Sequence, residues 1–546
     1  MTRPTSSSRP ASAARKKTVK PLGSVAFVGA GPGDPQLLTV RAVELLAKAD
    51  VVVTESQDAE FVRRYCREGV EVVDGSLGDD GQPLSHAVRA RLVAKAAKGG
   101  GLVVRLLDGD PFLYATGSEE AAACAKAGIP FEVVPGVSSI TAVPAYAGIP
   151  LTSAKHREVR VVNVAEGSVD WSDLGAGTAT LVLLAATAVM GDVAKSLIAA
   201  GRAPETPVAL TQSGTTTAQR TVVSTLERVA ADIKAAKLAP PTITVVGDTV
   251  GLRDSLSWFE TKPLFGWRVL VPRTKEQAGA LSDRLRAFGA VSEEVPTIAV
   301  EPPRTPQQME RAIKGLVTGR YEWIALTSRN AVKAVRERFE EYGLDARAFA
   351  GIKVAAVGEQ TAADLLAWGI KPDLVPSGEQ SAAGLLEDWP PYDPVFDPID
   401  RVFLPRADIA TENLVAGLVE RGWEVDDVTA YRTVRAAPPA APIREAIKSG
   451  GYDAVVFTSS STVRNLVGIA GKPHPSTVIA CIGPATAKTA EEHGLRVDVL
   501  APSPSVADLA CALSEYGATL RASAVAAGEP VLRPSQKRTT ARRKAT

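Results

Sequence analysis

The chain has 546 residues, enough for three to four domains of ordinary size. Apolar residues make up 45% of it and charged residues 23%, which is typical of a soluble globular protein. The formal net charge is +1, so no overall field favours nucleic acid or a membrane surface as a partner. The longest uncharged apolar run, residues 178–190, is shorter than the roughly 18 residues that a membrane span needs.

Cysteine and histidine are scattered along the chain. The four cysteines form no close pair, which argues against a Cys-x-x-Cys metal or redox site and fits a reducing compartment. None of the four histidines has a partner at metal-ligand spacing. We therefore expect no metal site and a cytoplasmic location.

Both ends of the chain are predicted to be tails. Residues 1–21 are rich in Ser, Pro, Ala, Arg and Lys, with no apolar segment that would indicate a secretory signal, so we expect disorder. Residues 519–546 end in a run of Lys and Arg. That run could contact anions or RNA, but basic ends are common and usually only aid solubility.

The folded part begins with alternating strands and helices. Residues 24–29 predict a strand, residues 36–49 an amphipathic helix and residues 51–53 a second strand. Glu55 lies just past the end of that second strand. Taken alone, it reads as a solvated loop glutamate.

Two further strands end in turns built from small residues. Residues 102–107 predict a strand that ends at Asp-Gly-Asp-Pro, and a helix is expected at 118–127. Residues 131–134 predict the next strand, which ends at Pro-Gly. Small ligands bind at such strand ends in open α/β sheets. The turn residues alone leave two interpretations open, a ligand site and two ordinary strand-to-helix turns.

The next segment has a second set of elements. We expect strands at residues 159–164, 181–184 and 242–247. Residues 193–201 predict a helix that a glycine ends, and residues 212–215 predict a polar turn.

These stretches, in this order and spacing, resemble the tetrapyrrole methyltransferases, and uroporphyrinogen-III C-methyltransferase in particular. The motifs are VGAGPGDP from Val28, DGDPF from Asp108, the pair of glutamates at 119–120, AGIPFEVVPGVSS from Ala127 and AYAGIPLT from Ala145. The resemblance covers residues 23–260. The glycine-rich loop alone would not carry it, because it has neither dinucleotide-binding spacing nor the Lys-Ser/Thr of a P-loop.

The resemblance implies a two-lobed fold with S-adenosylmethionine between the lobes. It places Glu55 where relatives carry an acid proposed to take the proton lost on methylation. Relatives of this half dimerise, so a homodimer through the N-terminal domain is left open. The positions implied for the cofactor are Pro32, Asp108, Gly109, Asp110, Leu113, Ser138, Ser139, Ala185 and Gly214.

The chain departs from that family's pattern at three places. Residues 74–81 lack the usual Gly-Lys-Arg, residues 115–118 lack an arginine, and Ala185 stands where relatives often have methionine. Two cations that would face a carboxylate-rich substrate are thus missing. An alternative hypothesis follows, in which this half is a degenerate binding or dimerisation module.

Residues 256–266 join the two halves of the chain. The aromatic residues Trp258, Phe259 and Phe265 predict that this joint packs against a domain face. After it, an apolar segment starts again at Arg268.

The second half contains an internal duplication. Arg273 matches Arg406, Ser328 matches Ser459, and Thr361 matches Thr486, each within a similar run of residues. Each copy alternates strands and helices, which predicts parallel sheets. We therefore expect a pair of similar α/β lobes with a cleft between them.

The doubled order resembles uroporphyrinogen-III synthase over residues 266–518. The motifs are TSRNAV from Thr327, VGEQTA from Val357, FTSSSTV from Phe457 and IGPATA from Ile482. That family also follows the methyltransferase in fused chains. Its relatives cross between lobes twice, which implies one lobe of 266–300 plus 435–518 and another of 301–434.

Tyr431 matches the family tyrosine proposed to assist departure of a hydroxyl from hydroxymethylbilane, before ring D attacks and inverts. A phenol suits that general-acid role. The alternative is a strand-end tyrosine that packs at the hinge.

Hydroxyl residues at predicted helix starts could hold the substrate's carboxylates, and simple helix capping is the alternative. Arginines near the same strand ends are further candidates for carboxylate partners. The substrate-binding residues that we predict are Arg273, Ser328, Thr361, Ser459 and Thr486, with Arg329, Arg406 and Arg432 as additional arginines.

We therefore expect a bifunctional tetrapyrrole enzyme that acts on small molecules, with a methyltransferase-like domain at 22–262 and a synthase-like domain at 266–518. The second would cyclise hydroxymethylbilane to uroporphyrinogen III, and the first would methylate that product toward precorrin-2. Alternatives are an active synthase fused to a degenerate module, and a non-enzymatic two-lobed binding protein in the second half. Siroheme and cobalamin are both left open as end products.

Overall fold

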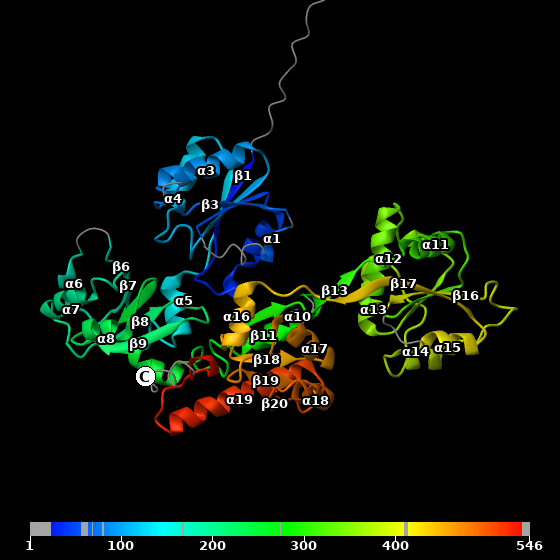
Figure 1. Ribbon diagram of the computed structural model, residues 1–546. Coiled ribbons are helices and arrows are strands. Elements are labelled where there is room, and N and C mark those ends of the chain that lie inside the picture. Colours follow the sequence, from blue (N-terminus) through cyan, green and yellow to red (C-terminus); the bar gives the residue numbers. More distant parts are fainter. Residues whose placement is uncertain are drawn as a thin grey trace, which may run out of the picture. The chain divides into compact units, whose positions relative to one another are not determined.

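The computed structural model describes residues 23–55, 64–67, 69–78, 81–165, 169–272, 275–408 and 413–537, without the side chains of 275–278. The chain divides into two compact units, Met1–Gly266 and Trp267–Thr546 (Figure 1). In its described part, each unit carries two five-stranded sheets. No described helix is long and apolar enough to span a membrane. The predicted tail at 1–21 and the last residues, 538–546, lie outside the described residues.

The first sheet of the N-terminal unit is wholly parallel. In sheet order its strands are β3 (Glu71–Asp74), β2 (Val51–Thr54), β4 (Leu102–Leu107), β1 (Ser24–Gly29) and β5 (Phe131–Val134). Its helices include α1 (Val40–Lys48), α3 (His86–Lys98) and α4 (Gly117–Lys126). Apolar side chains are buried on both faces, as expected for a parallel sheet. The predicted strands at residues 24–29, 102–107 and 131–134 are confirmed with those bounds.

The prediction of one helix over residues 36–49 is wrong. A short 3₁₀ helix, η1 (Pro35–Leu37), comes first, and α1 begins only at Val40. The reason is Thr39, which has an extended backbone and accepts the N–H of Ala42 on its hydroxyl at 3.1 Å. This N-cap bond starts a separate helix.

The second sheet of the N-terminal unit is mixed. Its order is β6 (Val159–Asn163), β7 (Thr180–Leu184), β10 (Thr242–Val246), β8 (Pro207–Gln212) and β9 (Arg220–Thr225). Only β6 and β7 run parallel, and the other neighbours are antiparallel. The predicted strands at 159–164, 181–184 and 242–247 are confirmed to within one residue.

Helices cover this second sheet and link it to the first. The covering helices are α6 (Trp171–Ala176), α7 (Met190–Ala199) and α8 (Val229–Ala236). Helix α7 begins earlier than predicted because Met190 is buried in the core, so packing holds its first turn. The linking helix is α5 (Ser139–Tyr146), whose Ile140 and Val143 pack against Val182 and Ile243 of the sheet.

The joint at 256–266 packs as predicted. It follows the 3₁₀ helix η2 (Asp248–Leu252) and α9 (Arg253–Leu256). The ring of Tyr146 lies 5.0 Å from Trp258 and 4.7 Å from Phe259, and Lys262 lies over both of those rings. Arg253 also binds Glu260 at 2.8 Å, so the joint is held to its own unit.

The first sheet of the C-terminal unit is parallel throughout. In order its strands are β12 (Val291–Val295), β11 (Arg268–Pro272), β18 (Ala454–Phe457), β19 (Val478–Cys481) and β20 (Val499–Leu500). Its helices are α10 (Lys275–Ala287), α16 (Ala441–Ser449), α17 (Ser460–Ala470), α18 (Pro484–Glu492) and α19 (Val506–Ala526). Helix α19 continues past residue 518, where the predicted tail begins.

The second sheet of this unit has the order β13 (Ile298–Glu301), β17 (Glu424–Arg435), β16 (Arg401–Ala407), β14 (Trp323–Leu326) and β15 (Lys353–Ala356). Only β13 is antiparallel to its neighbour. Its helices are α11 (Pro306–Val317), α12 (Arg329–Glu341), η3 (Ala346–Phe349), α13 (Glu359–Trp368), α14 (Ala382–Asp388) and α15 (Asn413–Glu420).

The chain passes between these two sheets twice, after β12 and after β17. Each sheet therefore combines strands from both copies of the duplication, and the predicted pair of similar α/β lobes is confirmed. The boundary that we placed after residue 300 falls inside β13, which pairs with β17. The cleft between the lobes stays a prediction.

Candidate active sites of the two units

The turns after β1, β4 and β5 pack backbone against backbone. Gly31 and Gly109 exchange two hydrogen bonds, of 3.3 and 2.9 Å. A Cβ on Gly136 would lie 2.0 Å from the carbonyl oxygen of Gly109, so no larger residue fits there. Glycine brings the strand ends together at the edge where the sequence predicts a ligand.

The two predicted aspartates have different surroundings. Asp110 accepts the N–H of Phe112 at 2.9 Å and that of Gly136 at 3.1 Å, so its carboxylate ties two turns together. Asp108 is exposed, and its carboxylate has no hydrogen-bond partner among the residues that the structure describes. Desolvation by the surrounding protein, followed by repulsion from Glu55, raises the pKa of Asp108. Of the two, only Asp108 is free to face a ligand.

The remaining predicted positions of the first lobe lie around Gly109. Ser138 caps α5 by accepting the N–H of Ile140, and Ser139 is its first residue. A Cβ on Gly109 would lie 3.8 Å from the Ser139 nitrogen, so the glycine leaves the start of α5 open. Leu113 is 46% exposed in the loop after β4. Pro32 is half-buried in the loop after β1.

The second lobe brings its predicted positions to the same region through α5. Ala185 follows β7 and Gly214 follows β8, and both strands pair with Ile243 of β10 near those ends. A Cβ on Gly214 would lie 2.4 Å from Val143 of α5. The N–H of Asp34, two residues after Pro32, donates to the Thr215 hydroxyl at 3.1 Å.

Left-handed backbone gathers at these turns. Among the described residues, five that are not glycine have positive φ, and four of them lie here: Tyr114, Ala185, Ser213 and Thr215. Such conformations are costly and collect at functional sites. Tyr114 and Thr215 are not among the predicted site residues, although Thr215 lies in the predicted polar turn at 212–215, because no local signal marks a strained backbone.

Glu55 lies in an ion-pair network that the sequence analysis also missed. Its Oε2 accepts Nη1 of Arg89 at 3.0 Å, and Arg105 donates to Oε1. Arg105 of β4 is fully buried and binds the equally buried Glu120 at 2.7 and 2.9 Å. An arginine inside the apolar run LVVRLL was the signal that could have revealed it.

In the C-terminal unit, Tyr431 lies beside Ser328. Their hydroxyl oxygens are 2.9 Å apart. Tyr431 is 7% exposed on β17, where it follows an extra residue, Ala430, that has no partner on β16: Arg406 pairs with Thr429 and Ala407 pairs with Tyr431. Ser328 caps α12 and accepts the N–H of Ala331 at 3.2 Å. Ser328 follows β14, which lies on the other side of β16 from β17, so the contact between the two hydroxyl groups spans the end of β16.

The other predicted hydroxyls follow parallel strands in the same way. Ser459 caps α17 in a capping box with Thr462, so capping is confirmed for both serines. The alternative that Thr361 and Thr486 are helix caps is wrong, because Gly358 and Gly483 occupy the N-cap positions of α13 and α18. These threonines are buried in the first turn of each helix. Ser328 and Thr361 thus share one edge of one sheet, while Ser459 and Thr486 share one edge of the other.

Three of the predicted arginines form ion pairs, and the fourth lies outside the described residues. Arg273 lies outside the described residues. Arg329 binds Asp364 at 2.6 and 3.0 Å, Arg406 binds Asp427, and Arg432 binds Glu301 at 2.6 Å. Each of the three described arginines therefore already has a carboxylate partner.

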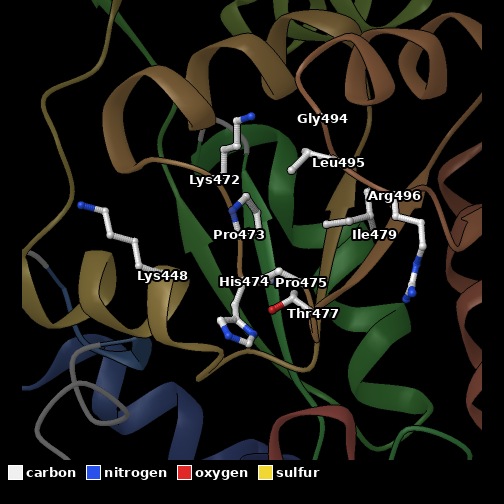
Figure 2. Close-up of a pocket in the computed structure, with 10 residues that line it drawn as sticks. All are labelled: Lys448, Lys472, Pro473, His474, Pro475, Thr477, Ile479, Gly494, Leu495 and Arg496. Atoms are coloured by element: carbon white, nitrogen blue, oxygen red, sulfur yellow. The ribbon is translucent and has the colours of Figure 1, made fainter. Parts of the chain in front are cut away.

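A cavity of 420 Å³ opens at the opposite edge of the first sheet of this unit (Figure 2). In Figure 2 the charged ends of Lys448, Lys472 and Arg496 point to different sides of it. Lys448 lies against Gly471 at the end of α17, and Lys472 lies against Gly494 just after α18. Basic side chains there complement helix C-termini, so the lysines have a structural role. We do not assign this cavity to the substrate.

Two family models match the chain. Tetrapyrrole (Corrin/Porphyrin) Methylases match residues 24–230, and Uroporphyrinogen-III synthase HemD matches residues 279–511. The porphyrin biosynthesis protein HemD of Ruminiclostridium josui is 32% identical over 508 residues, which is 91% of this chain and 98% of that protein.

Other relatives match one half. Siroheme synthase of Azotobacter vinelandii is 43% identical over 246 residues, 44% of this chain and 53% of that protein, so the match spans about half of its length. Uroporphyrin-III C-methyl transferase from Thermus thermophilus, solved with S-adenyl homocysteine, is 33% identical with a TM-score of 0.36 and covers 42% of this chain and 93% of that one. The chain belongs to the family of porphyrin biosynthesis proteins that join a tetrapyrrole methylase to a uroporphyrinogen-III synthase.

Proposed function

We propose that this chain is a bifunctional enzyme of tetrapyrrole biosynthesis. Its C-terminal unit cyclises hydroxymethylbilane to uroporphyrinogen III with inversion of ring D, and its N-terminal unit methylates that product toward precorrin-2 with S-adenosylmethionine. The observation that carries the proposal is that both family models match this one chain, which is 32% identical along 98% of a porphyrin biosynthesis protein. Coupling is chemically sensible, because one unit makes the substrate of the other.

In the C-terminal unit, Tyr431 is the general acid. The C–O bond at the terminal carbon of hydroxymethylbilane breaks with its electron pair on oxygen, and the phenol proton lets that oxygen leave as water. Ring D then attacks the resulting cation, and the proton that the product loses restores the phenol. Ser328 holds the phenol oxygen at 2.9 Å. Ser459 and the buried threonines 361 and 486 contribute polar contacts to the substrate's carboxylates.

In the N-terminal unit, the residues present fit S-adenosylmethionine. Asp108 supplies an unpaired carboxylate, Gly109 leaves the start of α5 open, and Ala185 exposes a small side chain. When bound, the cofactor supplies a methyl group on a positively charged sulfur. The protein's task is to align that group with the ring carbon and to receive the proton that the ring loses. The other residues that we propose to line the cofactor site are Pro32, Leu113, Ser138, Ser139 and Gly214.

A second candidate for the N-terminal unit is a binding module without catalysis. The observation that favours it is the lack of Lys and Arg in residues 74–81 and 115–118. Such a unit would hold a tetrapyrrole or a second copy of the chain without transferring a methyl group.

One experiment tests both units of the full-length protein. Hydroxymethylbilane is added with and without methyl-labelled S-adenosylmethionine, and the products are separated by chromatography after oxidation. We expect uroporphyrinogen III rather than the uncatalysed isomer I, and label in the tetrapyrrole. Isomer I alone would contradict the synthase assignment. Isomer III without label would favour the binding module.

A further inference from the structure

Two carboxylates follow neighbouring strands at the candidate methyl-transfer site. Glu55 comes directly after β2 and Asp108 directly after β4. The strands are parallel and Thr54 pairs with Leu106, so the two side chains leave the same edge of the sheet. The effect of the Glu55 charge on the pKa of Asp108 is consistent with their proximity.

Glu55 is fixed by arginines on both oxygens. Arg89 donates to Oε2 at 3.0 Å and Arg105 donates to Oε1. Both guanidinium groups are almost completely buried and also lie beside the buried Glu120, at 3.6 and 2.7 Å. These two charge-assisted bonds occupy one acceptor site on each oxygen and hold the Glu55 carboxylate in place.

Asp108 has the opposite surroundings. The residue as a whole is exposed, although the protein around its carboxylate partly excludes water, and no hydrogen bond to that carboxylate is present in the described part of the chain. The charged groups that act on it are Glu55 after β2 and Arg105 on β4. Through these two it adjoins an ion-pair network that also includes Arg89 and His86 on α3 and Glu120 on α4. Its pKa is raised by desolvation and by Glu55, which brings a carboxyl group closer to the range where it can take up and release a proton.

We propose that Asp108 is the base that receives the proton lost during methyl transfer, and that Glu55 remains a fixed anion beside it. This assignment rests on the proposed methyltransferase function and replaces the role that the sequence suggested for Glu55. Two carboxylates at one site thus take two roles because their surroundings differ.

An electron pair of the pyrrole carbon forms the new C–CH₃ bond, while the pair of the S–CH₃ bond stays on sulfur and leaves it neutral. The ring is then cationic and loses one proton. That proton passes to the Asp108 carboxylate and from there to water, because the side chain is exposed. The Glu55 anion stabilises the transient positive charge.

The test uses the full-length protein with uroporphyrinogen III and S-adenosylmethionine. We expect Asp108→Asn to lower kcat for methyl transfer about 100-fold or more, the usual scale of general-base catalysis, and to remove the fall in rate at acid pH. Asp108→Glu restores part of the rate because it keeps a carboxylate. Glu55→Gln, the matched control, lowers the rate but keeps the acid limb of the profile.

Two further readouts do not depend on activity. S-adenosylhomocysteine should still bind to Asp108→Asn in calorimetric titration, which would show that the variant keeps a folded cofactor site. Carbon-13 NMR of protein labelled at the aspartate carboxyl groups, with Asp108→Asn as the assignment control, should show Asp108 titrating above the usual pKa of about 3.9.

The outcomes separate the two claims. Wild-type protein that transfers no methyl group would overturn the proposed methyltransferase and this assignment together. An active wild type with an Asp108→Asn variant of equal rate and unchanged acid limb would overturn only the assignment. Loss of that limb in Glu55→Gln, with Asp108→Asn unaffected, would return the role to Glu55.

Discussion

At the scale of single residues, the Ser328–Tyr431 pair decides how the phenol can act. The Ser328 oxygen already accepts the N–H of Ala331 at 3.2 Å, so its own proton is available to Tyr431. If Ser328 donates, the phenol proton is left free for the departing hydroxyl. The same bond fixes the position of the phenol, which supports proton transfer in one geometry.

We therefore predict that Ser328→Ala lowers kcat for cyclisation about tenfold and leaves KM within about twofold, whereas Ser328→Thr restores most of the rate. Lost capping costs about 1 kcal/mol of stability and does not itself change the chemistry. Asp345→Ala is the control, because Asp345 caps η3 elsewhere in the same lobe. Measured rates and urea unfolding should show both caps destabilising and only Ser328 affecting kcat. Equal rates in the two variants would contradict the positioning role.

The adjacent glutamates of α4 give a second prediction at this scale. Glu120 is fully buried against Arg105, while Glu119 is exposed. Glu120→Ala leaves a buried guanidinium with too few partners and should cost about 3–5 kcal/mol. Glu119→Ala should change the free energy of unfolding by less than about 0.5 kcal/mol. Calorimetry of the N-terminal unit's unfolding transition measures both effects. Similar losses of stability in the two variants would show that the buried Arg105–Glu120 pair does not cause the destabilisation.

At the scale of elements, helix α5 joins the two sheets of the N-terminal unit, and Gly214 is where the second sheet touches it. A Cβ on Gly214 would lie 2.4 Å from Val143, a stiff β-branched side chain that cannot move aside easily. Gly214→Ala should displace the turn after β8, cost about 1–3 kcal/mol and weaken S-adenosylhomocysteine binding about tenfold in calorimetric titration. Gly251→Ala is the control, because no atom lies within 4 Å of its added Cβ. Unchanged binding in Gly214→Ala would exclude this contact from the site.

The elements also show what the sequence could and could not predict. The runs at 102–107 and 131–134 predict their strands with the correct bounds, because each is a short, β-branched or aromatic-rich run that ends at a turn of small residues. The first is almost wholly buried and the second is an edge strand. The helix expected at 36–49 is wrong, since the Thr39 cap competes with an amphipathic pattern that continues through it. No local pattern predicts the left-handed backbone at Ala185 and Thr215, and Thr215 also receives a hydrogen bond from the distant Asp34 N–H. The sequence also cannot distinguish the unpaired carboxylate of Asp108 from the paired one of Glu55, because the partners of Glu55 are distant in the chain.

At the scale of the whole molecule, the duplication predicted more than any single motif. Two copies of one strand and helix order imply two similar sheets, and the structure forms them by exchanging strands between the copies. The residue at which the chain crosses from one sheet to the other is harder to predict. Strand β13 belongs to the first copy by sequence, yet it pairs with β17 of the second copy. Hydroxyl residues at matching places in the copies consequently reach matching sheet edges.

The division into two compact units leads to the last prediction. Units with separate cores unfold independently, so calorimetry of the full-length protein should show two transitions. S-adenosylhomocysteine at about 100 times its Kd should stabilise one of them by about 2.7 kcal/mol and leave the other in place. Glu120→Ala should lower that same transition, which identifies it as the N-terminal unit, whereas Tyr431→Phe should abolish cyclisation without moving it. A single transition that shifts as a whole with ligand would mean that the two units unfold together, which would contradict their independence.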